Sequence, residues 1–189
     1  WRHPTLGLLP PGQFLPLAES FGLMPEIGAW VLGEACRQMH KWQGPAWQPF
    51  RLAINVSASQ VGPTFDDEVK RVLADMALPA ELLEIELTES VVMAVGDACA
   101  LLEKLRSLGI SLALDDFGTG YSSLAYLKRF DIDKLKIDRS FVRELLTNPA
   151  DMAITRAIMA LGGSLGLKLV AEGVEDMATG RVLTALGCD

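Results

Sequence analysis

Five short aliphatic segments alternate along this chain with longer stretches whose apolar residues recur at helical spacing. The strand-like segments cover residues 51–56, 83–87, 110–115, 135–138 and 168–171. The helix-like stretches cover residues 26–40, 69–76, 101–108, 122–130, 154–165 and 176–186. Strands that alternate with helices form a parallel sheet, so we predict an α/β fold, either a barrel or a doubly wound sheet. No Gly-x-Gly-x-x-Gly or P-loop motif follows a strand, which disfavours the doubly wound nucleotide-binding alternative.

Each predicted strand has an aliphatic face and a second face that carries a polar residue near the strand end. Successive side chains of a strand point to opposite sides of the sheet. In a barrel, the aliphatic face would lie under the helices and the other face would point inward. The carboxyl ends of barrel strands form the mouth that holds the active site. The inward polar residues predicted at this mouth are Asn55, Glu86, Asp115, Lys136 and Glu172.

Carboxylates dominate the predicted mouth, because Asp116, Glu89 and Glu175 lie just beyond the strand ends. Like charges a few Å apart raise one another's pKa, and buried charges without partners are costly. Divalent cations remove both problems, and ligands that are all oxygen favour Mg²⁺ or Mn²⁺ over zinc. The adjacent residues Asp115 and Asp116 suit two metals that act together on a phosphodiester.

A simpler interpretation exists for any one of these residues, since a carboxylate at a strand end is more often a salt-bridge partner or a helix cap. A lysine such as Lys136 is usually a partner for such an acid. Five polar residues at one parity and at one end of the sheet nevertheless favour a metal-binding or catalytic mouth.

The segment after Asp115 and Asp116 contains Gly118 and Gly120 and leads to the predicted helix over 122–130, with Ser122 as its N-cap. From the residues alone, two interpretations are equally open. One is an ordinary turn between a strand and a helix. The other is a mobile loop that couples the metal site to an outside surface.

Five motifs, one at the end of each predicted strand, carry a more specific signal. They are Asn55-Val56-Ser57, Glu86-Leu87-Thr88-Glu89, Asp115-Asp116-Phe117-Gly118-Thr119-Gly120, Lys136-Ile137-Asp138-Arg139-Ser140-Phe141 and Ala171-Glu172-Gly173-Val174-Glu175. In this order and at this spacing they resemble the EAL domain family. The resemblance implies a TIM-like (β/α)8 barrel with one reversed strand, which hydrolyses cyclic di-GMP to linear pGpG with Mg²⁺ or Mn²⁺ in bacterial second-messenger signalling.

The resemblance also implies roles for individual residues. Lys136 would hold the attacking water or stabilise charge near it, and Glu172 would accept the proton of that water. Glu175 would lie close to the substrate, and Glu89 would anchor the loop after Asp116. The implied ligands of two divalent cations are Asn55, Glu86, Asp115, Asp116 and Glu172.

The resemblance treats residues 1–189 as one EAL phosphodiesterase domain that lacks its first strands and its last strand. Trp1-Arg2-His3-Pro4 resembles the segment just after the name-giving Glu-Ala-Leu, and the chain stops before a glutamine expected at the site. We therefore expect a part of a longer protein. In that protein the domain would form a homodimer through the helix over 122–130 and lie beside sensory or GGDEF-type domains.

Composition excludes several other classes of partner. The net charge of −7 offers no basic footprint for a nucleic-acid polymer. Three distant cysteines suggest neither a disulfide framework nor a metal site, and they fit a reducing compartment. No apolar run approaches the ~20 residues of a membrane helix. We expect a cytoplasmic segment without membrane contact, in a parent protein that a membrane anchor could still hold.

Three functions follow from these alternatives. An active cyclic di-GMP phosphodiesterase is favoured, because every motif residue within the chain is present. A catalytically inactive EAL-type receptor for cyclic di-GMP would typically have lost ligand or loop residues. A barrel enzyme that forms a Schiff base on Lys136 is disfavoured, because the neighbouring carboxylates would raise the pKa of that lysine.

Overall fold

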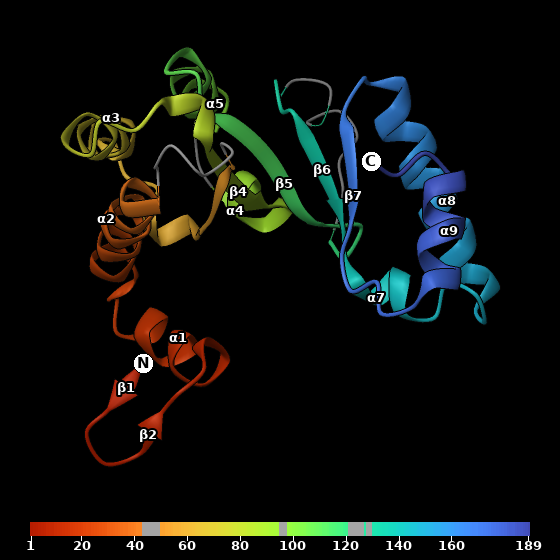
Figure 1. Ribbon diagram of the computed structural model, residues 1–189, viewed down its shortest axis with the longest axis horizontal. Coiled ribbons are helices and arrows are strands. Elements are labelled where there is room, and N and C mark those ends of the chain that lie inside the picture. The colour runs from red at the N-terminus through yellow and green to blue at the C-terminus, as the bar shows by residue number, and fades with distance from the viewer. Residues whose placement is uncertain (43–49, 95–97, 121–126, 128–129) are drawn as a thin grey trace.

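The computed structural model describes residues 1–42, 50–94, 98–120, 127 and 130–189, and its centre is a parallel sheet (Figure 1). The strands follow one another in chain order, β3-β4-β5-β6-β7, without the order reversal of a doubly wound sheet. This order is the one that a barrel requires. All five predicted strands are confirmed, with bounds β3 (Leu52–Val56), β4 (Leu83–Thr88), β5 (Ser111–Phe117), β6 (Lys134–Ile137) and β7 (Lys168–Ala171).

Helices flank both ends of the sheet in Figure 1. Their ends follow local sequence signals. The Asp176 carboxylate accepts hydrogen bonds from two backbone N–H groups at 2.8 Å at the start of the last helix. Gly109, at φ +91°, follows another helix in a conformation that glycine adopts without strain. The five long predicted helices within the described residues are confirmed as α2 (Met24–Trp42), α3 (Phe65–Asp75), α5 (Ala98–Ser107), α8 (Pro149–Ser164) and α9 (Met177–Ala185).

The hydrophobic core lies between the aliphatic face of the sheet and these helices. Leu83, Leu112 and Leu135 on three adjacent strands are fully buried, as are Val69 of α3 and Leu105 of α5. Burial of each such side chain contributes about 1.5–3 kcal/mol of transfer free energy. The aliphatic side chains of each strand pack under the helices. The alternate side chains therefore face inward, as predicted.

Several short elements were not predicted. All but one of them have six residues or fewer, which is too few to show a periodicity. They are β1 (Arg2–His3), β2 (Gly7–Leu8), α1 (Pro11–Ser20), η1 (Ala58–Gln60), η2 (Ala80–Leu82), α4 (Glu89–Ala94) and α7 (Arg139–Arg143). The strands β1 and β2 form a separate antiparallel pair. Most of the predicted helix over 122–130 lies outside the described residues. No helix among the described residues has the length and apolarity to span a membrane.

Candidate active site

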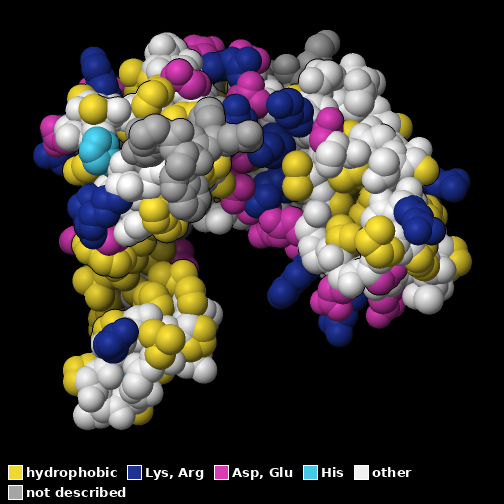
Figure 2. Space-filling view, viewed as in Figure 1, with side chains coloured by type: hydrophobic (Ala, Val, Ile, Leu, Met, Phe, Trp, Pro, Cys, Tyr) yellow, Lys and Arg dark blue, Asp and Glu magenta, His cyan; other side chains and the backbone are white. Residues whose placement is uncertain are grey.

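Lys136 lies at the centre of a group of carboxylates on the inward face of the sheet. Its Nζ is 2.9 Å from Glu86 Oε2, 2.9 Å from Asp115 Oδ2 and 2.7 Å from Glu172 Oε1. Glu86 lies on β4, Asp115 on β5 and Lys136 on β6, and Glu172 directly follows β7. Glu86, Asp115 and Lys136 are buried, so each charge depends on its partners to offset the loss of hydration. Figure 2 shows charged side chains of both signs gathered over the middle of the sheet.

The surroundings of Lys136 keep it protonated. Burial by itself would lower the pKa of Lys136, because it disfavours the ammonium form. Hydrogen bonds to Glu172, Asp115 and Glu86 outweigh this effect and raise the pKa above its ordinary value. A Schiff base requires a free amine at the start of the reaction, so this geometry argues against carbonyl chemistry at Lys136.

Asp115 and Asp116 reach the same site because β5 is irregular at this point. The pairing of β5 with β6 is regular up to Leu114 and shifts before Phe117. Asp116 has φ 53°, in the left-handed region that few residues other than glycine adopt. Regular alternation would have placed adjacent side chains on opposite faces, whereas an irregularity of this kind re-aims a side chain. The sequence carried no signal for it.

A compact acidic cluster results from this geometry. Asp115, Asp116 and Glu172 each offer one carboxylate oxygen, and these oxygens all lie within 4.8 Å of one another. Burial raises the pKa of Asp116, and the nearby negative charges of Asp115, Asp138 and Glu172 raise it further. A divalent cation would relieve this crowding, and the donors are all oxygen. The residues present therefore fit a hard metal ion.

Glu89 connects β4 to the turn that follows the two aspartates. It is the first residue of α4, and its Oε1 accepts a hydrogen bond from the Gly118 N–H at 2.7 Å. Gly118 has φ +97°, and a Cβ at this position would lie 3.0 Å from Phe141 Cε2 and 3.1 Å from Ile158 Cδ1. The turn is therefore held from two sides, by a carboxylate and by close packing that only glycine permits.

The sequence model of the EAL domain matches residues 1–189. This chain belongs to the EAL domain family. MucR of Pseudomonas aeruginosa, named a bifunctional diguanylate cyclase/cyclic di-GMP phosphodiesterase, is 49% identical over 100% of this chain and 28% of its own length. NbdA of the same organism, named a cyclic di-GMP phosphodiesterase, is 47% identical over 93% of this chain and 23% of its own length. The chain thus spans about a quarter of the length of these two relatives.

Solved EAL structures match the fold closely. The PaMucR phosphodiesterase in complex with c-di-GMP superimposes with a TM-score of 0.94 at 49% identity, and the match covers 100% of this chain and 77% of that chain. The EAL enzyme Bd1971, in a form bound to cAMP and cyclic di-GMP, gives a TM-score of 0.91 at 30% identity over 100% of this chain and 52% of that chain. Together with the sequential strand order, these matches confirm that the parallel sheet is an arc of a TIM-like barrel.

Asn55 and Glu175 are the remaining predicted site residues, and both are exposed. Asn55 is the register partner of Glu86 on the neighbouring strand, so both side chains lie on one face, and Asn55 is exposed. Glu175 is exposed on the segment between Glu172 and α9. Its role beside a substrate stays a prediction. Sequence reasoning assigned no separate role to Asp138, whose negative charge acts on Asp116 and which lies two residues after Lys136.

Proposed function

We propose that this EAL domain is the catalytic part of a longer protein that hydrolyses cyclic di-GMP to linear pGpG with Mg²⁺ or Mn²⁺. The observation that carries the proposal is the cluster of Asp115, Asp116 and Glu172 oxygens within 4.8 Å, beside the Lys136 ammonium. Support also comes from two relatives that are named cyclic di-GMP phosphodiesterases, and from a similar structure solved as a c-di-GMP complex.

The oxygen-rich inward face would hold two divalent cations, with one amide and four carboxylates as ligands. When bound, such cations would withdraw charge from phosphodiester oxygens and lower the pKa of a bound water. Among the described residues, the ammonium of Lys136 contacts three of these four carboxylates, so their combined negative charge exceeds its single positive charge. The proposed ligands are Asn55, Glu86, Asp115, Asp116 and Glu172.

The protein's own groups would position and deprotonate the attacking water. The Lys136 Nζ donates its three N–H groups to carboxylates of Glu86, Asp115 and Glu172. Cations bound to these carboxylates would compete for their oxygens and would release an N–H of Lys136 toward a water or a phosphate oxygen. The Glu172 side chain is 35% exposed, which lets its carboxylate reach that water and accept its proton. Glu175 would approach the substrate from the rim.

The proposal extends to the context of the domain. A chain that spans about a quarter of its relatives' length fits a parent protein with further domains, and sensory or GGDEF-type domains are the kinds expected beside an EAL domain. A homodimer through residues 122–130 stays a prediction, because most of that segment lies outside the described residues.

Incubation of the purified parent protein with cyclic di-GMP and Mg²⁺, followed by chromatography, tests the proposed reaction. We expect linear pGpG as the product and no product when a chelator is present. Binding of cyclic di-GMP without turnover, in a protein with its metal bound, would instead support the alternative of a catalytically inactive receptor.

A further inference from the structure

A second glutamate–lysine pair lies two residues nearer to the starts of the strands than the pair Glu86 and Lys136 in the site. Glu84 and Glu86 are two residues apart on the inward face of β4, and Lys134 and Lys136 are two residues apart on the inward face of β6. Lys134 Nζ lies 2.6 Å from Glu84 Oε1, much as Lys136 Nζ lies 2.9 Å from Glu86 Oε2. The two contacts are thus translated copies of each other along the same two strands.

Both lysines reach across β5, and the register places Lys134 at the level of Glu86 rather than of Glu84. Ala113 of β5 is the register partner of Glu86 on one side and of Lys134 on the other. Lys134 therefore starts at the level of Glu86, yet its amine binds Glu84, two residues lower. Ala113 contributes only a methyl group between Lys134 and Glu86, and the flexible stem of a lysine can adopt either direction.

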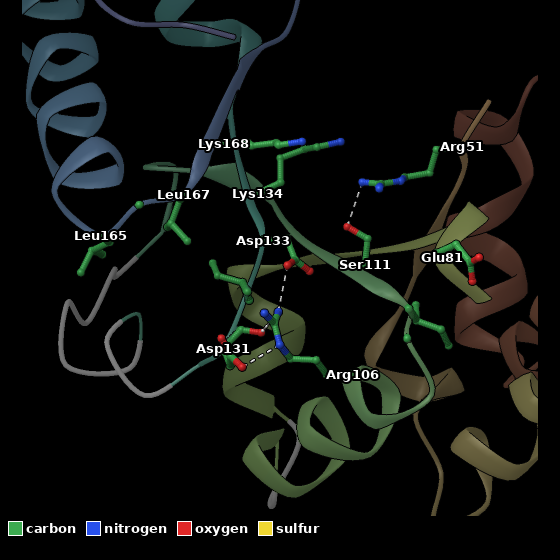
Figure 3. Close-up of a pocket in the computed structure, with 14 residues that line it drawn as sticks. Arg51, Glu81, Arg106, Ser111, Asp131, Asp133, Lys134, Leu165, Leu167 and Lys168 are labelled. Atoms are coloured by element: carbon green, nitrogen blue, oxygen red, sulfur yellow. Dashed lines mark hydrogen bonds and ion pairs between the residues drawn. The ribbon is translucent and has the colours of Figure 1, made fainter. Parts of the chain in front are cut away.

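Glu84 is built to hold this amine. Its side chain is 2% exposed, and it also receives Arg51 Nη1 at 3.4 Å and Ser111 Oγ at 3.3 Å. Figure 3 shows Lys134 and Lys168 extended side by side toward Arg51, around a cavity of about 620 Å³ at the starts of the strands. Lys134 and Lys168 are register partners on adjacent strands. Like charges in this arrangement repel, so the Lys134 amine needs a carboxylate.

We propose that Glu84 is a positioning residue, which holds Lys134 in the lower layer and so leaves Glu86 free to serve Lys136 and a divalent cation. The inference rests on the proposed function in that it takes Glu86 as a metal ligand. Without Glu84, the Lys134 amine turns to Glu86, the carboxylate at its own level. A second ammonium in the site then opposes cation binding by direct repulsion and competes with Lys136 for its partner.

The parent protein with three substitutions tests this inference by the binding of Mn²⁺ alone, measured by calorimetry without substrate. Glu84→Gln is expected to weaken Mn²⁺ binding by about tenfold or more, because a mobile ammonium enters the site. Lys134→Met, which removes that ammonium, is expected to leave the affinity within about twofold of the wild type. The double variant Glu84→Gln/Lys134→Met is expected to regain wild-type affinity, because the ammonium that would enter the site is absent.

Restoration by the second substitution is the outcome that a general loss of stability cannot imitate. A double variant that binds Mn²⁺ as weakly as Glu84→Gln overturns the inference, as does a Glu84→Gln protein with unchanged affinity. If Glu84→Gln does not fold, Glu84→Asp keeps the buried charge on a shorter stem, and the same comparison with and without Lys134→Met decides. A wild type that binds Mn²⁺ at this site but does not hydrolyse cyclic di-GMP overturns only the proposed function, and one that binds no Mn²⁺ overturns both.

Discussion

The Glu89 carboxylate and the Gly118 N–H, 29 residues apart in the chain, form a hydrogen bond of 2.7 Å that ties the end of β4 to the turn after Asp115 and Asp116. This turn comes directly after the end of β5, which carries Asp115 and Asp116 of the acidic cluster. Loss of this bond is therefore expected to disturb the position of the aspartates as well as the local stability.

We predict that Glu89→Ala leaves the barrel folded but lowers kcat by about tenfold and weakens the apparent Mg²⁺ affinity. Glu89→Gln is the matched control, because its side-chain oxygen can still accept the Gly118 hydrogen bond, and it should retain more of both. Kinetics, Mg²⁺ titration and the thermal midpoint of each variant separate the two roles of Glu89. A lower midpoint with normal kinetics and metal affinity would mean a purely structural role, worth about 1 kcal/mol.

Gly173, which directly follows Glu172, offers a test of how precisely that carboxylate must be held. It has φ +72°, and a Cβ there would lie 2.8 Å from Arg139 Cβ. We predict that Gly173→Ala lowers stability by about 1–3 kcal/mol and lowers kcat as well, because the strain moves Glu172. Gly163→Ala is the control, since nothing lies within 4 Å of its added Cβ and alanine favours the helix. Equal behaviour of the two variants would refute the requirement for glycine after Glu172.

Lys136→Ala removes the ammonium that bridges three carboxylates. We predict that kcat falls by about 10² or more while substrate binding changes much less, because a group that orients the attacking water acts mainly in the transition state. Lys104→Met is a control with a similar loss of charge, at an exposed ion pair with Asp66 on the helical face. A change confined to KM would identify Lys136 as a substrate-binding group instead.

The raised pKa of Asp116 predicts a pH dependence in chelator-treated protein. A carboxyl group whose pKa is higher in the folded state contributes stability that is present below its unfolded pKa and is lost as pH rises through the folded pKa. The Asp116→Asn variant stays neutral, as the protonated carboxyl group is, and should not undergo this loss of stability. Thermal midpoints of the wild type and the variant should therefore lie close together at about pH 4 and separate towards about pH 7, with the variant becoming the more stable of the two. Parallel curves would contradict the crowding seen around Asp116.

Much of the fold followed from side-chain parity. The aliphatic residues of β3 to β7 set the strands, and their buried face fixed which polar residues point inward. The convergence of Glu86, Asp115 and Glu172 on Lys136 could be predicted for the same reason. Parity holds because it depends only on the two-residue period of an extended chain.

Other features depend on contacts that no local pattern records. The irregularity of β5 places Asp115 and Asp116 together, although alternation predicts opposite faces. The contact of Lys134 with Glu84 joins two strands that lie on either side of β5, which no local pattern records.

The hydrolysis rate of the Asp115→Asn protein, with Mg²⁺ added and then removed, tests whether the acidic cluster holds a catalytic metal ion. Asp115 lies in the acidic cluster and also contacts Lys136 at 2.9 Å, so a neutral amide there changes both the ligand charge and the lysine's partner. We predict that the wild-type parent protein converts cyclic di-GMP to linear pGpG only with Mg²⁺ or Mn²⁺, and that Asp115→Asn loses about 10³-fold or more of this turnover. Wild-type turnover that persists in excess chelator, or an Asp115→Asn protein as active as the wild type, would contradict a metal-dependent role of this cluster.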